Sequence, residues 1–132
     1  MGLLILVLRT DKPESEIGLY DDQNQISYLR WQAHFELAET IHQQIHDLLN
    51  SVDKNWHDLE GVVVYKGPGS FTGLRIGISF ANTLAYSLSI PIIGEISDQW
   101  IDLGLKKLLD GKNDKEIMPE YGAEVHITSP KK

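Results

Sequence analysis

A glycine-rich segment at residues 66–77, KGPGSFTGLRIG, has the composition most suited to binding a ligand in this chain. It follows a β-branched apolar run and opens a helical pattern, so it predicts a strand-to-helix turn whose free backbone N–H groups could bind an anion. Neither common phosphate motif fits, because no Gly-Lys-Ser/Thr follows and Gly73 comes one residue late for GxGxxG after Gly67 and Gly69. A tight structural turn is therefore favoured over a phosphate site. The loop residues under consideration are Gly67, Pro68, Gly69, Ser70, Phe71, Thr72 and Arg75.

Two features of the following helix indicate close contacts. Arg75 falls in the predicted first turn, where a cation opposes the helix dipole at a cost of about 0.3–1 kcal/mol. This predicts a specific acceptor for Arg75, either within the fold or on a partner. Gly73, Gly77 and Ala81 recur every four residues and leave one side nearly bare. Interior glycine costs about 1 kcal/mol relative to alanine, which close approach of another helix would explain, in this chain or in another subunit.

Three kinds of catalytic site are weakly supported. His42 and His46 are four residues apart on a predicted helix and could share a metal ion, but Gln43 replaces the zincin glutamate. Ser70 lacks the Gly-x-Ser-x-Gly elbow of serine hydrolases. A ribonuclease H-like nuclease needs clustered carboxylates on the central strands, where this chain offers Glu14 and Glu16. We predict no catalytic residue and no metal site, with glycoprotease and nuclease as the weaker alternatives.

Composition and charge limit the function further. The chain has 132 residues, 42% hydrophobic and 23% charged, which is typical of one globular domain. Its net charge of −7 lies in residues 1–60, which carry 11 acidic and 4 basic side chains, whereas residues 61–132 carry 8 of each. An acidic half repels phosphate backbones, so direct tRNA binding by this chain alone is not expected. There is no cysteine, which suits a reducing cytoplasm, and the apolar start is too short for a membrane span.

Hydrophobic periodicity predicts three strands, a helix, a strand, a helix, a strand and a helix. The strands are expected at 3–9, 14–20, 25–32, 61–66 and 90–93, and the helices at 34–50, at 70–88 and from Ser97 onward. The polar cluster at 21–24 is typical of a hairpin turn. An early hairpin followed by alternating strands and helices predicts an α/β fold with a mixed five-stranded sheet. This is the ribonuclease H-like order of elements.

The glycine-rich stretch carries a family resemblance. KGPGSFTGLRIGISFANTLAYSLSIPIIG, residues 66–94, resembles the hallmark of the bacterial TsaB (YeaZ-like) family of tRNA threonylcarbamoyladenosine biosynthesis. Residues 17–49 resemble that family's hairpin and a helix opening with His-x-Glu, here His34 and Glu36. The resemblance implies one ribonuclease H-like lobe of the actin-like ATPase (ASKHA) kind over residues 1–110, followed by a tail at 111–132.

The resemblance also implies a function. It predicts a cytoplasmic, non-catalytic scaffold that pairs with the catalytic paralogue TsaD through its first two helices, with the ATPase TsaE joining them. This complex transfers a threonylcarbamoyl group to adenosine in tRNA. No cofactor of its own is expected, and ATP or ADP would bind only within the complex. A homodimer using the same surface is the alternative. The surface would comprise His34, Glu36, Ile41, Ile45, Gly73, Ile76, Gly77, Phe80, Ala81 and Leu84.

Two departures from the family pattern bear on this expectation. The family has two lobes, and this sequence contains a match to the first. The first strand of the family ends in an Asp-Thr-Ser-like element, which resembles a phosphate-binding aspartate. Here Arg9-Thr10 stands in that place, with Asp11 next to it. Autonomous ATP hydrolysis is therefore not expected.

Overall fold

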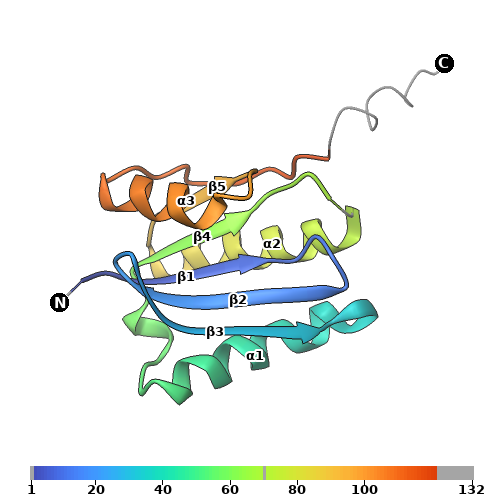
Figure 1. Ribbon diagram of the computed structural model, residues 1–132, viewed down its shortest axis with the longest axis horizontal. Helices are drawn as coiled ribbons and strands as arrows, with labels where there is room; N and C mark the ends of the chain where they lie inside the picture. The colour runs from blue at the N-terminus through green and yellow to red at the C-terminus, as the bar shows by residue number, and fades with distance from the viewer. Residues whose placement is uncertain (1, 70, 122–132) are drawn as a thin grey trace.

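The computed structural model of this chain describes residues 2–69 and 71–121. Its elements follow the predicted order, with a hairpin first and alternating strands and helices after it (Figure 1). The strands are β1 (Leu4–Arg9), β2 (Glu14–Asp21), β3 (Asn24–Gln32), β4 (Gly61–Tyr65) and β5 (Ile92–Glu95). The helices are α1 (Leu37–Ser51), α2 (Phe71–Leu88) and α3 (Trp100–Leu109), with short 3-10 turns at His34–Glu36 and Trp56–Asp58.

The five strands form one mixed sheet in the order β3-β2-β1-β4-β5. β1, β2 and β3 pair antiparallel, as the predicted hairpin requires, whereas β1, β4 and β5 pair parallel. The apolar runs predicted as strands at 3–9 and 61–66 form β1 and β4, in the interior of the sheet. Leu4–Leu8 and all five residues of β4 are buried. The predicted α/β fold class is confirmed.

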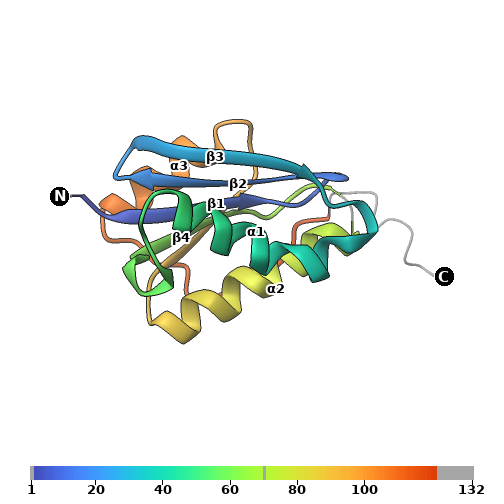
Figure 2. The same ribbon diagram turned by 90° about the horizontal axis from the view of Figure 1, so that it is seen from below.

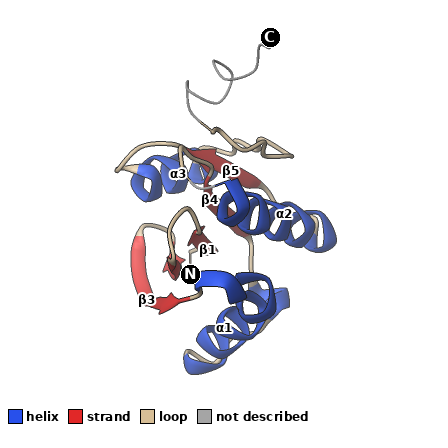
Figure 3. Ribbon diagram, turned by 90° about the vertical axis from the view of Figure 1, so that its right-hand side faces the viewer, coloured by secondary structure: helices blue, strands red, loops and turns tan. Residues whose placement is uncertain are grey.

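Helices cover the sheet unequally on its two faces. α1 and α2 lie side by side on one face, α1 against β2 and β3 and α2 mainly against β4 (Figure 2). α3 packs on the other face, against β4 and β5 (Figure 3). The α1/α2 layer and the loops at the carboxyl ends of β1 and β4 carry the residues of the candidate site.

The predicted starts of α1, β5 and α3 are shifted in the structure. α1 begins at Leu37 rather than at residue 34, because residues 34–36 form a 3-10 turn. β5 begins two residues later than expected, because Ser89 and Ile90 complete the end of α2. Ser89 adopts a positive φ of 56°, and the Ile90 N–H donates to the Ala85 carbonyl 3.0 Å away. α3 begins at Trp100 rather than at Ser97. Ser97 instead forms the preceding turn, in which the Trp100 N–H donates to its carbonyl at 3.0 Å.

The first part of the predicted tail packs against the domain. Residues 111–121 contain no helix or strand, yet Ile117 is only 4% exposed. The Asp114 N–H donates to the Ile92 carbonyl at 2.8 Å, and Asn113 Oδ1 accepts a bond from the Ile92 N–H at 3.1 Å. This segment therefore covers part of the free edge of β5. Residues 122–132 lie outside the described part.

No helix in the described part of the chain is both long and apolar enough to cross a membrane.

Candidate functional site

The glycine-rich turn is a closely packed connection between β4 and α2. Gly67 has a φ of +131°, which other residues rarely adopt, and the Lys66 carbonyl accepts a hydrogen bond from the Glu120 N–H at 2.7 Å. The Tyr65 hydroxyl donates to the Pro68 carbonyl at 3.0 Å. A Cβ at Gly69 would overlap the Asp11 side chain, so only glycine fits there without a shift. Ser70 and the side chains of Phe71 and His34 lie outside the described part.

Asp11 lies beside this turn and forms an ion pair with Arg9. The Arg9 guanidinium donates to both carboxylate oxygens, at 2.7 and 3.2 Å, and lies 3.9 Å from the centroid of the Tyr65 ring. Burial lowers the pKa of Arg9, but the hydrogen bond and charge of Asp11 raise it to a net value above its ordinary one. The cation next to the turn is thus already neutralised, and the carboxylate would repel an incoming phosphate. This arrangement favours the tight-turn interpretation of the loop.

The bare face of α2 packs inside the chain, which corrects the prediction that it meets a partner. The Thr10 hydroxyl donates to the Gly73 carbonyl at 2.7 Å, and a Cβ at Gly77 would overlap the Thr10 side chain. Ala81 is fully buried. The close approach that the glycines permit is therefore to Thr10, immediately after β1, and not to another helix.

Ile41 and Ile45 are also buried in the core, although Ile41 contributes to the lining of a hollow between α1 and α2. They are 2% and 0% exposed, because they lie on the face of α1 that packs on the sheet. By contrast, Ile76, Phe80 and Leu84 are only partly buried. Glu36 is exposed at the start of α1. The predicted pairing surface is thus accessible to a partner at Glu36, Ile76, Phe80 and Leu84, whereas its other described residues are largely buried.

The available residues border a groove between α1 and α2. One hollow of about 570 Å³ is lined by Ala38, Thr72, Arg75, Ile76, Ser79 and Phe80, among others. An apolar hollow of about 250 Å³ adjoins it, with His42, Trp56, Leu84 and Leu88 in its lining. Phe80 and Thr83 border both hollows, which therefore adjoin, and we call the two together the docking groove. It combines half-buried apolar side chains with a polar rim.

The two histidines considered as metal ligands take part in side-chain packing at this groove. The His42 ring stacks on Trp56 with centroids 4.8 Å apart. The Trp56 Nε1–H donates to His46 Nδ1 at 3.3 Å, which uses the lone pair that a metal would need. Within residues 2–69 and 71–121, no group of three or more His, Asp or Glu side chains could hold a metal ion.

The carboxylates proposed for a nuclease are not gathered into a cluster either. Glu14 is exposed at the start of β2. Glu16 accepts a hydrogen bond from the Tyr28 hydroxyl at 2.6 Å and lies 3.8 Å from the Arg30 guanidinium. This sheet-face contact occupies Glu16 with two neighbours on β3.

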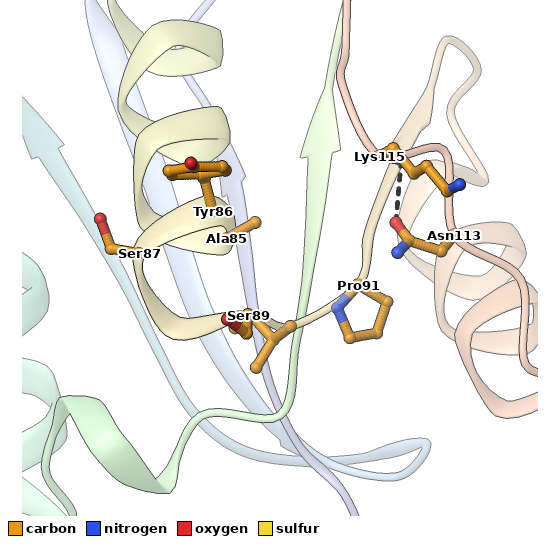
Figure 4. Close-up of a pocket in the computed structure, with 8 residues that line it drawn as sticks. Ala85, Tyr86, Ser87, Ser89, Pro91, Asn113 and Lys115 are labelled. Atoms are coloured by element: carbon orange, nitrogen blue, oxygen red, sulfur yellow. Dashed lines mark hydrogen bonds between the residues drawn. The ribbon is translucent and has the colours of Figure 1, made fainter.

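A further hollow lies at the carboxyl end of α2, where sequence reasoning placed no site (Figure 4). Its volume is about 670 Å³, and Tyr86, Ser89, Pro91, Asn113 and Lys115 line it. Tyr86 is 88% exposed. The residues come from two segments well separated in sequence, so no local spacing could have indicated them. None of the predicted site residues reaches this hollow.

The comparisons with known proteins agree with this fold. The family model described as TsaD, tRNA N6-adenosine threonylcarbamoyltransferase, matches residues 32–100, which are 69 of the 132 residues. The chain therefore belongs to the TsaD family. Within that family it is a TsaB/YeaZ-like protein, as its relatives show.

Two relatives are named tRNA threonylcarbamoyladenosine biosynthesis protein TsaB. The Bacillus subtilis protein is 58% identical over 48 residues, which are 36% of this chain and 21% of that protein. The Escherichia coli protein is 34% identical over 95 residues, covering 68% of this chain and 38% of that protein. The structure of YeaZ from Pseudomonas aeruginosa superposes with a TM-score of 0.66 at 22% identity, over 71% of this chain and 44% of YeaZ. The chain thus spans less than half the length of these relatives.

Proposed function

We propose that this chain is a non-catalytic subunit that pairs with a TsaD-type threonylcarbamoyltransferase in the cytoplasm, together with a TsaE-type ATPase. The complex would serve the threonylcarbamoylation of adenosine in tRNA. The names of the relatives and the TsaD family match support the pathway. The contacts of this chain support a binding role within it.

The observation that carries the proposal is the docking groove. Phe80, Leu84 and Ile76 are packed against the core on one side and accessible on the other. Exposed apolar area of this kind, rimmed by polar side chains, is typical of protein–protein contact sites. It lies between the two helices through which the family resemblance places the partner.

The region around Asp11 supports a non-catalytic role. Asp11 is the carboxylate nearest the place of the family's phosphate-binding aspartate, and both of its oxygens accept hydrogen bonds from Arg9. A carboxylate held by a bidentate guanidinium is a poor metal ligand, because binding a cation would first require that ion pair to break. ATP would then be bound and used by the partner subunits.

Sedimentation velocity of the purified chain, alone and mixed with a TsaD-type subunit from the same source, tests the proposal. We expect a mixed species with micromolar or tighter affinity, and faster tRNA threonylcarbamoylation when the chain is added. A chain that sediments as a homodimer and ignores the TsaD-type subunit would support the self-pairing alternative. Absence of both species would contradict a binding role for the groove.

A further inference from the structure

The outer face of α2 is unusual for a helix exposed to water, because it is almost free of charge. Arg75 is the only charged residue among the 18 residues of α2. The other exposed side chains are uncharged: Thr72, Ser79, Thr83, Tyr86 and Ser87. A solvent-facing helix normally carries charges of both signs on its polar face. Interface cores are depleted of charged residues but enriched in arginine.

Arg75 has no acceptor in the part of the chain that the structure describes. The ion pairs there join Arg9 to Asp11, Arg30 to Glu16 and Lys107 to Glu95. Arg75 is exposed and is the fifth residue of α2, in the second turn rather than the first. Its opposition to the helix dipole is therefore weaker than the sequence indicated, since that effect fades beyond the first turn. Within residues 2–69 and 71–121, the acceptor predicted for Arg75 inside the fold is therefore not found.

Arg75 also stands at the boundary between two hollows. On one side it lines the docking groove, and on the other it lines a hollow of about 320 Å³ with Glu116, Met118 and Pro119. The segment at 116–119, which lines this second hollow, is held in place by Asn82. The side-chain amide of Asn82 donates to the Ile117 carbonyl and accepts from the Ile117 N–H, both at 2.9 Å. Met118 is left 69% exposed beside Arg75.

We infer that Arg75 is the charged anchor of the docking surface and binds a carboxylate of the partner subunit. This inference rests on the proposed function and specifies the partner's chemistry: an acidic side chain must face the middle of α2. An arginine on a helix that carries no other charge becomes desolvated when a partner covers that helix. A bidentate carboxylate then replaces the water it loses. A partner with a lysine or arginine at this point would be rejected.

Binding of the full chain to the TsaD-type subunit, measured with single-charge variants, tests the inference. Arg75→Gln should weaken binding at least tenfold, about 1.4 kcal/mol. Its affinity should also fall less steeply between about 50 and 300 mM salt, because salt screens the ion pair that this variant lacks. The affinity of Arg75→Lys should lie between those of the wild type and Arg75→Gln, because lysine keeps the charge but lacks the planar guanidinium group. Lys106→Gln removes the same charge from an exposed position on α3 and should bind as the wild type does.

The outcomes separate the inference from the proposed function. If the wild type binds and Arg75→Gln binds equally well with the same salt dependence, the carboxylate contact is wrong and the pairing stands. If the wild type itself does not bind, the proposed function fails and this inference fails with it. Thermal unfolding of each variant establishes that the folded chain is being compared.

Discussion

At the scale of single residues, the end of β1 is held by contacts with little tolerance for change. Thr10 fills the space that the missing side chain of Gly77 leaves, and its hydroxyl binds the carbonyl of Gly73 one turn earlier. On the opposite face of the sheet, the hydroxyl of Tyr28 donates to Glu16, beneath the guanidinium of Arg30. The Thr10 contact joins the end of β1 to α2, which is distant in sequence, and the Tyr28 contact joins the neighbouring strands β2 and β3.

Gly77→Ala should destabilise the chain despite the better helix propensity of alanine. The new Cβ would overlap Thr10, which we expect to cost about 1–3 kcal/mol, against a gain of about 1 kcal/mol in propensity. Urea unfolding measures the balance. The cost should be smaller in a Thr10→Ala background, with a coupling of at least about 0.5 kcal/mol. Ser79→Ala, at an exposed position of α2, should be nearly neutral, and equal effects of the two single changes would refute the contact.

Tyr28 should make stability depend on alkaline pH. Burial, and then the hydrogen bond to Glu16, raise the pKa of Tyr28 above its ordinary value of 10.0. Its stabilising effect is therefore complete below pH 10 and declines as pH rises above it, because the unfolded chain releases this proton first. The difference in unfolding free energy between wild type and Tyr28→Phe should shrink between pH 8 and about pH 11. A difference that stays constant over this range would contradict the assignment.

At the scale of elements, the sheet and helices depend on a strap of irregular chain. Residues 113–120 bond to β5 and to Lys66 and place Ile117 in the core, although they form no helix or strand. Asn82 on α2 holds the middle of this strap by its two bonds to Ile117. The strap therefore connects α2 with the free edge of β5.

Asn82→Ala should loosen the strap without unfolding the sheet. The backbone groups of Ile117 would lose both partners, which costs about 1–3 kcal/mol when such groups stay buried. Local opening relieves that cost, so hydrogen exchange at the Ile117 amide should accelerate at least tenfold, while β1 and β4 stay protected. Asn50→Ala is the matched control, because Asn50 is exposed and its side chain bonds only to His46, one turn earlier in α1. Unchanged exchange at Ile117 would show that the strap does not depend on Asn82.

At the scale of the whole molecule, the sequence predicted the architecture well because its signals are local. Buried runs such as Leu4–Leu8, the hairpin turn at 21–24 and the 3.6-residue period of α1 each determine an element without knowledge of its neighbours. The identity of the contact at Gly77 could not be predicted in this way. A bare helix face shows only that something approaches closely, and here it is Thr10, more than 60 residues earlier. The strap has no periodicity to detect.

The exposed position for testing the assembly is therefore Thr83 rather than Gly77. Thr83 borders the docking groove and the hollow beside Met118, and its side chain is exposed, so Thr83→Arg should fold normally. A long cation in the middle of the groove should weaken binding to a TsaD-type subunit at least tenfold, both by volume and by its proximity to Arg75. Leu103→Arg places the same side chain on the exposed side of α3, and its binding should match the wild type. If Thr83→Arg sediments with the partner as the wild type does, the pairing surface lies elsewhere. If both variants lose binding, the effect is one of net charge, and the acidity of the chain would then be what attracts the partner.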